Sequence, residues 1–313
     1  MKLPGTGSAR DAKTLAAFFA IYLIWGSTYL AIKYAVETIP PFLMMGTRSV
    51  VAGTILFSWS RFRGDENLRK AHWPSLFIIG ALFFLVGHGA LAWAQQNVPS
   101  GLAALLVASE PLWIALMEST AFRDFSIGFG GVLGLVLGFV GMLVLIIPGN
   151  SVGVEQTDIL GAAAILIATL SWSSGAVYLR VAKLPRSSTL TAGVELVIGG
   201  LMLYVAAFGF GEVGHLLSHS VSFRSILALG YLIIFGSIVA FTAYVWLLGK
   251  TSATRVATHT YVNPVIAVIL GWAVAHEPLS LNVLVAAVII IVAVYLVLKD
   301  RAIKPTETGR QIQ

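Results

Sequence analysis

The chain contains 313 residues, of which 58% are apolar or aromatic and only 11% are charged. A soluble domain keeps about a quarter of its residues charged so that water can cover it. Most of this surface must therefore face a medium other than water. The absence of cysteine excludes a disulfide framework and a thiolate metal site. The formal charge of +6 would suit a nucleic-acid partner, and the positions of the charged residues along the chain decide whether one is expected.

Ten apolar runs follow one another along the chain. A helix needs about 20 mostly apolar residues to cross a bilayer, and a spanning backbone must satisfy its own hydrogen bonds. The runs cover residues 15–36, 42–60, 73–95, 101–121, 127–147, 159–179, 189–209, 225–248, 254–275 and 281–298. We therefore predict an all-α integral membrane protein with ten transmembrane helices and polar tails at residues 1–14 and 299–313.

Lysine and arginine residues set the predicted orientation, because the cytoplasmic segments of membrane proteins are enriched in them. With the N-terminus in the cytoplasm, nearly all Lys and Arg outside the ten runs fall on the cytoplasmic side, and Arg224 falls on the other. We therefore expect both termini to be cytoplasmic in a plasma membrane or bacterial inner membrane. The positive charge is then a topology signal, and no nucleic-acid partner is expected.

Similar residues recur in the two halves of the chain, at residues 15–149 and 150–298. The matched pairs are Trp25 with Trp172, Arg48 with Glu195, and Pro111 with Pro264. Each half holds five runs, an odd number, so the second half should enter the membrane from the opposite side. Inverted repeats of this kind place a binding site near the midplane and permit alternating access.

Three stretches carry a resemblance to a known family. They read "LIWGSTYLAIKYAVETIPPFLMMGTRSVVAG", "WAQQNVPSGLAALLVASEPLW" and "VAFTAYVWLLGKTSATRVATHTYVNPVIAVILGWAVAHEPLS". They resemble EamA-type members of the drug/metabolite transporter superfamily. The resemblance implies a ten-helix secondary exporter of small metabolites, such as amino acids, or of drugs, with a central cavity between the halves.

A glutamate and a proline interrupt the fourth run. Pro111 removes a backbone donor and bends a helix, and the freed groups are tolerated in a membrane only against protein or a wet cavity. Asn263 and Pro264 repeat this pattern of a polar residue followed by a proline in the ninth run. An ionisable side chain inside a span usually faces a cavity or a partner. Our hypothesis is that Glu110 lines the cavity and contributes to proton coupling or to cation recognition; a structural hydrogen bond between helices is the alternative.

Two histidines are further candidates, because imidazole titrates near physiological pH. A histidine among apolar neighbours is more often a packing residue, and we favour that reading for His259. Glycines flank His88 and allow a ligand to approach closely, so His88 is the second proton-coupling candidate. No third ligand stands at a recognisable spacing, so no metal site is predicted.

Arg48 and Glu195 occupy equivalent positions in the second and seventh runs. They can pair with each other across the repeat interface, or they can present charge to a zwitterionic substrate. Both alternatives stay open at the level of sequence.

Trp25 and Trp172 open the first helix of each half, and each is followed by small residues that permit close packing. Aromatic rings at the midplane offer a face to an amine through cation–π attraction. The full set of candidate cavity residues is Trp25, Ser27, Thr28, His88, Glu110, Pro111, Trp113, Trp172, Ser173, Glu195, Tyr244, His259, Tyr261, Asn263 and Pro264.

The leading interpretation is a secondary transporter driven by substrate exchange or a proton gradient, since no GxxxxGK[ST] motif for ATP is present. It is not expected to be an enzyme or to need a cofactor. The alternatives are an intramembrane enzyme that uses His88, Glu110 and His259, or a membrane sensor. A small molecule and the lipid bilayer are the expected partners. Glycines at 130, 134 and 138 form a GxxxG face that serves either internal packing or a homodimer.

Overall fold

The computed structural model describes residues 7–121, 128–146, 159–248, 256 and 259–303, and within these ranges the chain is helical and contains no strand. The first half contains α1 (Gly7–Ala35), α2 (Pro41–Phe62), η1 (Lys70–His72), α3 (Trp73–Ile79), η2 (Gly80–His88), α4 (Gly89–Ala94), α5 (Ser100–Val107), α6 (Glu110–Ala121) and α7 (Phe129–Ile146). The second half contains α8 (Ile159–Tyr178), α9 (Ser188–Gly209), α10 (Glu212–Ser218), α11 (Phe223–Tyr231), η3 (Leu232–Val239), α12 (Ala240–Leu248), α14 (His259–Ala275) and α15 (Leu281–Ile303). The all-α prediction is confirmed for the described residues.

The expected tails are partly helical. Helix α1 begins at Gly7, and α15 continues to Ile303. The remaining parts of both tails, residues 1–6 and 304–313, lie outside the described residues.

Seven helices are long and apolar enough to cross a membrane, judged by length and composition. They are Ala12–Ala35, Pro41–Phe62, Lys70–Ala94, Ser100–Glu118, Ile159–Tyr178, Ser188–Gly209 and Phe223–Tyr244. Three shorter apolar helices coincide with the other expected runs: Phe129–Val144, Val262–Ala275 and Leu281–Val297. Each of the seven coincides with one expected run, while the full number of ten crossings stays a prediction.

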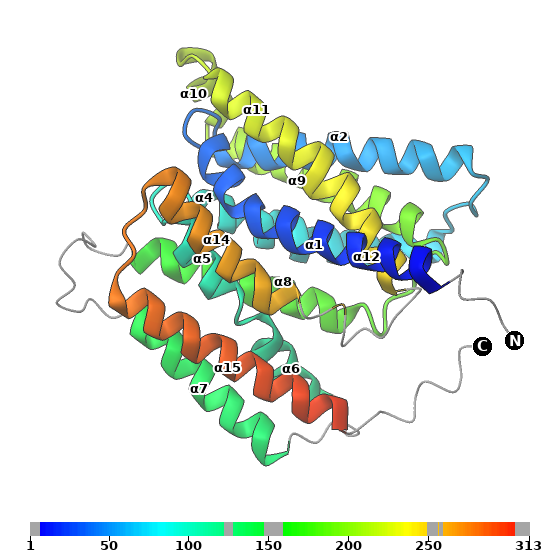
Figure 1. Ribbon diagram of the computed structural model, residues 1–313. Coiled ribbons are helices and arrows are strands. Elements are labelled where there is room, and N and C mark those ends of the chain that lie inside the picture. Colours follow the sequence, from blue (N-terminus) through cyan, green and yellow to red (C-terminus); the bar gives the residue numbers. More distant parts are fainter. Residues whose placement is uncertain (1–6, 122–127, 147–158, 249–255, 257–258, 304–313) are drawn as a thin grey trace, which may run out of the picture.

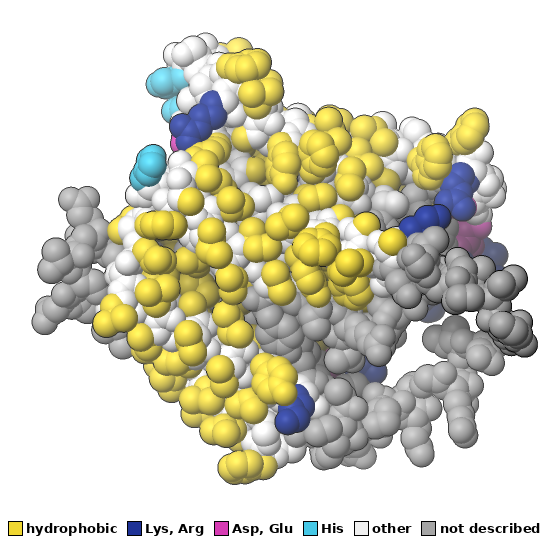
Figure 2. All heavy atoms as spheres, in the orientation of Figure 1, with side chains coloured by type: hydrophobic (Ala, Val, Ile, Leu, Met, Phe, Trp, Pro, Cys, Tyr) yellow, Lys and Arg dark blue, Asp and Glu magenta, His cyan; other side chains and the backbone are white. Residues whose placement is uncertain are grey.

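The described helices run between two ends of one bundle (Figure 1). We call the end at which α1 begins and α15 finishes the inner end. The other, at which α1 finishes and α2 begins, is the outer end, and α10 lies there. Hydrophobic side chains cover much of the visible face between the two ends (Figure 2). Such a continuous apolar surface marks contact with another apolar medium.

Helices α2 and α9 approach each other until their backbones touch. A Cβ atom added at Gly53 would lie 2.8 Å from the carbonyl oxygen of Gly193, and one added at Gly193 would lie 2.7 Å from the amide nitrogen of Phe57. No side chain fits in either place. The glycines therefore allow the second helix of each half to form one close seam.

The glycine face of α7 is used inside the chain. A Cβ atom at Gly134 would lie 2.7 Å from the Ala293 carbonyl oxygen of α15, and one at Gly138 would collide with Leu112 of α6. The internal-packing interpretation is confirmed for these two glycines. The possible homodimer is not tested by these contacts and stays a prediction.

Two π-helical segments stand at corresponding places in the two halves. Segment η2 (Gly80–His88) interrupts the third helix of the first half, and η3 (Leu232–Val239) interrupts the third helix of the second half. π-Helical turns are rare in proteins, and those that occur often lie at functional sites.

The helices of one half also pack on those of the other in a reciprocal way. Helix α1, the first of its half, packs against α14, the fourth expected helix of the second half. Helix α8, the first of its half, packs against α5 and α6, which together form the fourth helix of the first half. Helices α7 and α15 pack side by side (Figure 1).

A carboxylate joins the two halves at the inner end. Asp65, just after α2, accepts hydrogen bonds from the Ser187 hydroxyl (2.6 Å) and the Ser60 hydroxyl (2.6 Å). These bonds, that of Ser187 first, lower the pKa of the Asp65 carboxyl below its ordinary value. Ser187 also caps α9 by accepting a bond from the Leu190 amide.

We predict that Asp65→Asn lowers the melting temperature of the detergent-solubilised protein at pH 7. A carboxyl whose pKa is lowered by folding stabilises the protein above its unfolded pKa, and this contribution is lost as the pH falls through the folded pKa. The difference between variant and parent should therefore shrink below about pH 4, the ordinary range of an aspartate. A difference that stays constant from pH 7 to pH 3 would contradict this account.

We also predict that Gly193→Ala separates α2 from α9 and destabilises the fold by about 1–3 kcal/mol, as overpacking usually does. Gly209→Ala, at the end of the same helix, is the matched control, because nothing lies within 4 Å of a Cβ added there. Thermal unfolding of both variants checks the expectation. Equal melting temperatures would show that the seam relaxes freely.

Candidate functional site

Trp25 lies in α1 where that helix meets the second half. Its indole Nε1 donates a hydrogen bond to the Gly236 carbonyl of η3 (3.1 Å). The Trp25 ring centroid lies 5.2 Å from that of Tyr244 in α12 and 5.0 Å from that of His259 in α14. Three predicted cavity residues thus form one aromatic group, which we call the Trp25 cluster.

Trp172 lies at the corresponding place in α8. Its ring stacks on Phe83 of η2 with centroids 4.5 Å apart, and its centroid lies 5.0 Å from that of His88. The neighbouring Ser171 hydroxyl donates to the Leu82 carbonyl of η2 (2.8 Å). We call Trp172, Phe83 and His88 the Trp172 cluster.

The two clusters follow one design. In each, the first helix of one half donates a hydrogen bond to a carbonyl in the π-helical segment of the other half: Trp25 to Gly236, and Ser171 to Leu82. A change from α- to π-helical bonding alters the usual pairing of carbonyl groups, so carbonyls at such a segment can take donors from another helix. The donors therefore tie the halves together across the bundle.

The two histidines differ in their hydrogen bonds. The Nδ1 atom of His259 lies 2.9 Å from the Val256 carbonyl, within its own segment. The Nδ1 atom of His88 is buried and has no hydrogen-bond partner within the part of the chain that the structure describes. Arg48 lies within electrostatic range of the His88 ring. Because a buried polar atom without a partner is costly, His88 is the better candidate to meet a water molecule or a ligand.

The two prolines have different effects on their helices. Helix α5 ends at Val107 and α6 begins at Glu110, so the fourth apolar run is broken just before Pro111. Helix α14, in contrast, continues through Pro264 without a break. The expected interruption is present in the first half, and the second half keeps a continuous helix.

Glu110 stands at the first position of α6 and is half-buried. Its carboxyl lies within electrostatic range of the Tyr29 hydroxyl of α1 and the Tyr244 hydroxyl of α12. The Ser173 hydroxyl of α8 lies 3.4 Å from the Glu110 backbone carbonyl, to which it donates. Glu110 is therefore close to elements of both halves, and Tyr244 is its neighbour within the Trp25 cluster.

Trp113 belongs to neither cluster. Its Nε1 donates to the Ser109 hydroxyl (3.2 Å), which donates in turn to the Leu106 carbonyl (2.6 Å). Its ring packs edge-on against Phe139 of α7, with centroids 5.1 Å apart. These contacts stabilise the interruption between α5 and α6, and all of them lie within the first half.

The hydroxyls that follow Trp25 are bonded. Ser27 Oγ donates to the Ile24 carbonyl (2.8 Å) and lies 2.7 Å from the Tyr231 hydroxyl at the end of α11. Thr28 Oγ1 donates to the Trp25 carbonyl (2.6 Å). Ser27 thus adds a second bond between α1 and the third helix of the second half.

Asn263 links α14 to α1. With its amide oriented so that the nitrogen donates, that nitrogen lies 3.2 Å from both the His259 and the Tyr22 carbonyl oxygens. Tyr261 belongs to the same helix, and its side chain lies outside the described residues.

Arg48 and Glu195 do not pair with each other: among the described residues, the ion pairs are Arg180–Glu118 and Arg224–Glu37. The Arg48 Nε donates to the Ser237 hydroxyl of η3 (2.9 Å). One carboxyl oxygen of Glu195 is buried and has no hydrogen-bond partner within the described ranges. Of the two alternatives raised by the sequence, direct pairing is absent in this structure.

Glu277 has a structural role that the sequence did not predict. Helix α14 ends at Ala275, and the next residue, His276, lies in the left-handed region (φ 55°). The Glu277 carboxylate accepts hydrogen bonds from the backbone amides of Ser100 (2.6 Å) and Gly101 (3.1 Å) at the start of α5. A carboxylate at a helix N-terminus satisfies free N–H groups and complements the helix dipole. The "HEPLS" stretch was the available signal, since it belongs to the family resemblance.

Within the described residues, no group of three or more His, Cys, Asp or Glu side chains is placed to hold a metal ion.

Comparison with known proteins identifies the family to which the chain belongs. Residues 12–147 and 159–299 each match the EamA-like transporter family. The chain is 36% identical over 294 residues to the uncharacterised inner membrane transporter YedA of Escherichia coli, covering 93% of this chain and 92% of that protein. It is 25% identical over 290 residues to the uncharacterised transporter YoaV of Bacillus subtilis, covering 91% and 96%.

A solved crystal structure shares the fold, with a TM-score of 0.61 and 21% sequence identity over 91% of this chain and 97% of that one. The family match covers nearly all of the chain, and the described helices include seven that can span a membrane. This chain therefore belongs to the EamA-like transporter family and is a multi-pass transporter of the cell membrane.

Proposed function

We propose that this chain is a secondary active transporter that exports small metabolites, such as amino acids or related amines, or drugs. It works by alternating access through a cavity between two five-helix repeats of opposite orientation. The single observation that carries the proposal is the reciprocal docking of Trp25 on η3 and Trp172 on η2. Each half uses its first helix to close on the third helix of the other, as two inverted copies of one unit would.

The proposed topology has ten membrane-spanning helices with both termini in the cytoplasm. The repeats correspond to residues 15–149 and 150–298, and the tails to 1–14 and 299–313. The inner end of the bundle is then cytoplasmic, and Lys and Arg side chains are visible there (Figure 2). Arg224 lies at the outer end, at the start of α11.

The proposed substrate site lies between the Trp25 and Trp172 clusters. Aromatic faces attract cations, and Glu110 supplies a carboxyl close to Tyr244. This combination favours a substrate with an amine and an apolar part. The other candidates would contribute walls, hydroxyls or helix shape: Ser27, Thr28, His88, Pro111, Trp113, Ser173, Glu195, His259, Tyr261, Asn263 and Pro264.

Flux into proteoliposomes tests the function directly. Purified protein is reconstituted and supplied with labelled amino acids, polyamines and cationic drugs, with and without a pH gradient. We expect accumulation of at least one amine-containing compound above protein-free liposomes. Absence of flux for the whole panel would refute the proposed substrate class.

We predict that Glu110→Gln abolishes the dependence of transport on a pH gradient, because it removes the proposed proton-carrying group while keeping its shape. Glu118→Gln is the matched control on the same helix, since Glu118 is paired with Arg180 (2.9 Å), and this variant should keep the pH dependence. The measurement is the initial rate of flux at two imposed gradients. Retained pH dependence in Glu110→Gln would remove the coupling role.

We predict that Trp25→Phe slows transport by about fivefold, the effect of losing one hydrogen bond of about 1 kcal/mol. The change removes the bond to Gly236 and keeps most of the ring. Trp93→Phe is the control, because Trp93 is 39% exposed on α4 and should leave the rate unchanged. Equal rates in the two variants would contradict a role for the docking bond.

A further inference from the structure

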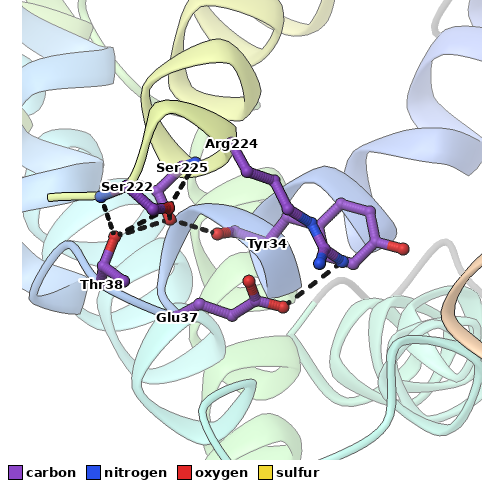
Figure 3. Close-up of polar contacts among 6 residues, drawn as sticks. All are labelled: Tyr34, Glu37, Thr38, Ser222, Arg224 and Ser225. Carbon is purple, nitrogen blue, oxygen red and sulfur yellow. Dashed lines mark hydrogen bonds and ion pairs between the residues drawn. The ribbon is translucent and has the colours of Figure 1, made fainter.

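A group of polar side chains joins the end of α1 to the start of α11 at the outer end of the bundle (Figure 3). Thr38 Oγ1 donates to Ser225 Oγ (2.8 Å) and accepts from the Ser222 amide (3.0 Å). Ser225 Oγ donates to the Tyr34 carbonyl (2.7 Å). These bonds cross from the first half of the chain to the second.

Arg224 adds a second contact at the same place. Its guanidinium carbon lies 3.5 Å from the centroid of the Tyr34 ring, and its Nη2 lies 3.5 Å from Glu37 Oε1. Figure 3 shows Arg224 reaching from α11 toward Tyr34 and Glu37. We name Tyr34, Glu37, Thr38, Ser222, Arg224 and Ser225 the outer clasp.

The outer clasp is one part of a longer seam between α1 and the third helix of the second half. Further along the seam, Ser27 Oγ lies 2.7 Å from the Tyr231 hydroxyl. Deeper still, the Trp25 indole donates to the Gly236 carbonyl (3.1 Å). The seam is thus closed at three levels, and the clasp is its outermost level.

A similar contact closes the inner end. Ser75, near the start of the third helix of the first half, accepts a bond from the Lys183 amide (3.1 Å) and lies 3.3 Å from the Tyr178 hydroxyl. Ser75 and Ser225 hold corresponding places in the two halves. Each binds the segment between the first and second helices of the opposite half.

We propose that the outer clasp is the contact that must open before the interior of the protein can communicate with the outer side of the membrane. The inference rests on the alternating-access function proposed above. Separation of the outer end of α1 from the start of α11 breaks the bond between Thr38 and Ser225. Contacts between exposed or neutral polar groups are individually weak, which suits a closure that forms and breaks in every cycle.

A disulfide in place of the hydroxyl bond tests the proposal, and the natural chain contains no cysteine that would interfere. Thr38→Cys and Ser225→Cys form the disulfide. A third substitution, Ser27→Cys, places a cysteine inside the seam whose labelling reports access from the outer side. A membrane-impermeant maleimide is added to the outer side of right-side-out vesicles, and mass spectrometry follows labelling of the peptide that carries position 27. We expect the oxidised protein to label at least tenfold more slowly than the reduced protein.

Ser222→Cys with Ser225→Cys is the matched control. The Ser222 hydroxyl, which caps α11, lies 3.1 Å from that of Ser225. Their disulfide therefore stays within the second half, and the reporter should label at the same rate before and after oxidation. Thr38→Ala with Ser225→Ala, which weakens the clasp, should raise the labelling rate several-fold.

Equal labelling of the reporter in the oxidised and reduced Thr38→Cys/Ser225→Cys protein would overturn the proposal, and so would an absence of labelling in both. The assay needs no substrate. If the protein transports none of the tested compounds but its reporter still labels more slowly after oxidation, the role of the outer clasp stands. Only the proposed transport function is then refuted.

Discussion

The first helix of each half is held against a π-helical segment of the opposite half, and the geometry of the candidate site depends on this contact. Trp25 donates to the Gly236 carbonyl, and Ser171, next to Trp172, donates to the Leu82 carbonyl. In hydrocarbon a backbone carbonyl that leaves its own helix needs another donor. The same two contacts therefore satisfy the backbone, join the halves and bring the two aromatic clusters into the bundle.

The clusters differ in what they leave open. Around Trp25, the nitrogen of His259 is bonded to Val256 and the amide of Asn263 is bonded to neighbouring carbonyls. Around Trp172, the Nδ1 atom of His88 has no partner in the described part of the molecule. The unmatched polar capacity thus lies on the His88 side, while the Glu110 carboxyl lies near Tyr244. A substrate that bridges the clusters would meet these groups at different points.

Much of the fold could be predicted from the sequence, because membrane insertion imposes one requirement on every span: a long apolar helix. Length and composition were sufficient for helices such as α2 and α9. The sequence also predicted Trp25 and Trp172 as equivalent residues, since each is followed by small residues that let another helix approach, and each is found against a π-helical segment of the other half.

The details that the sequence did not show depend on contacts between distant segments. Pro111 and Pro264 are the same residue type, yet the helix is broken just before one and continues through the other. Arg48 could have paired with Glu195, but its guanidinium bonds to Ser237 of η3. Neither π-helical segment has a sequence signal that distinguishes it from an ordinary apolar helix.

The contact of α2 with α9 has a mechanical consequence. At Gly53 and Gly193 the Gly193 carbonyl oxygen and the Phe57 amide occupy the space that the missing Cβ atoms leave, so a shift along the helix axis would move these backbone atoms toward neighbouring residues that carry a Cβ. Rotation about the point of contact displaces these backbone atoms least. In the alternating access that we propose, a tilt of one half on the other would therefore turn about this seam.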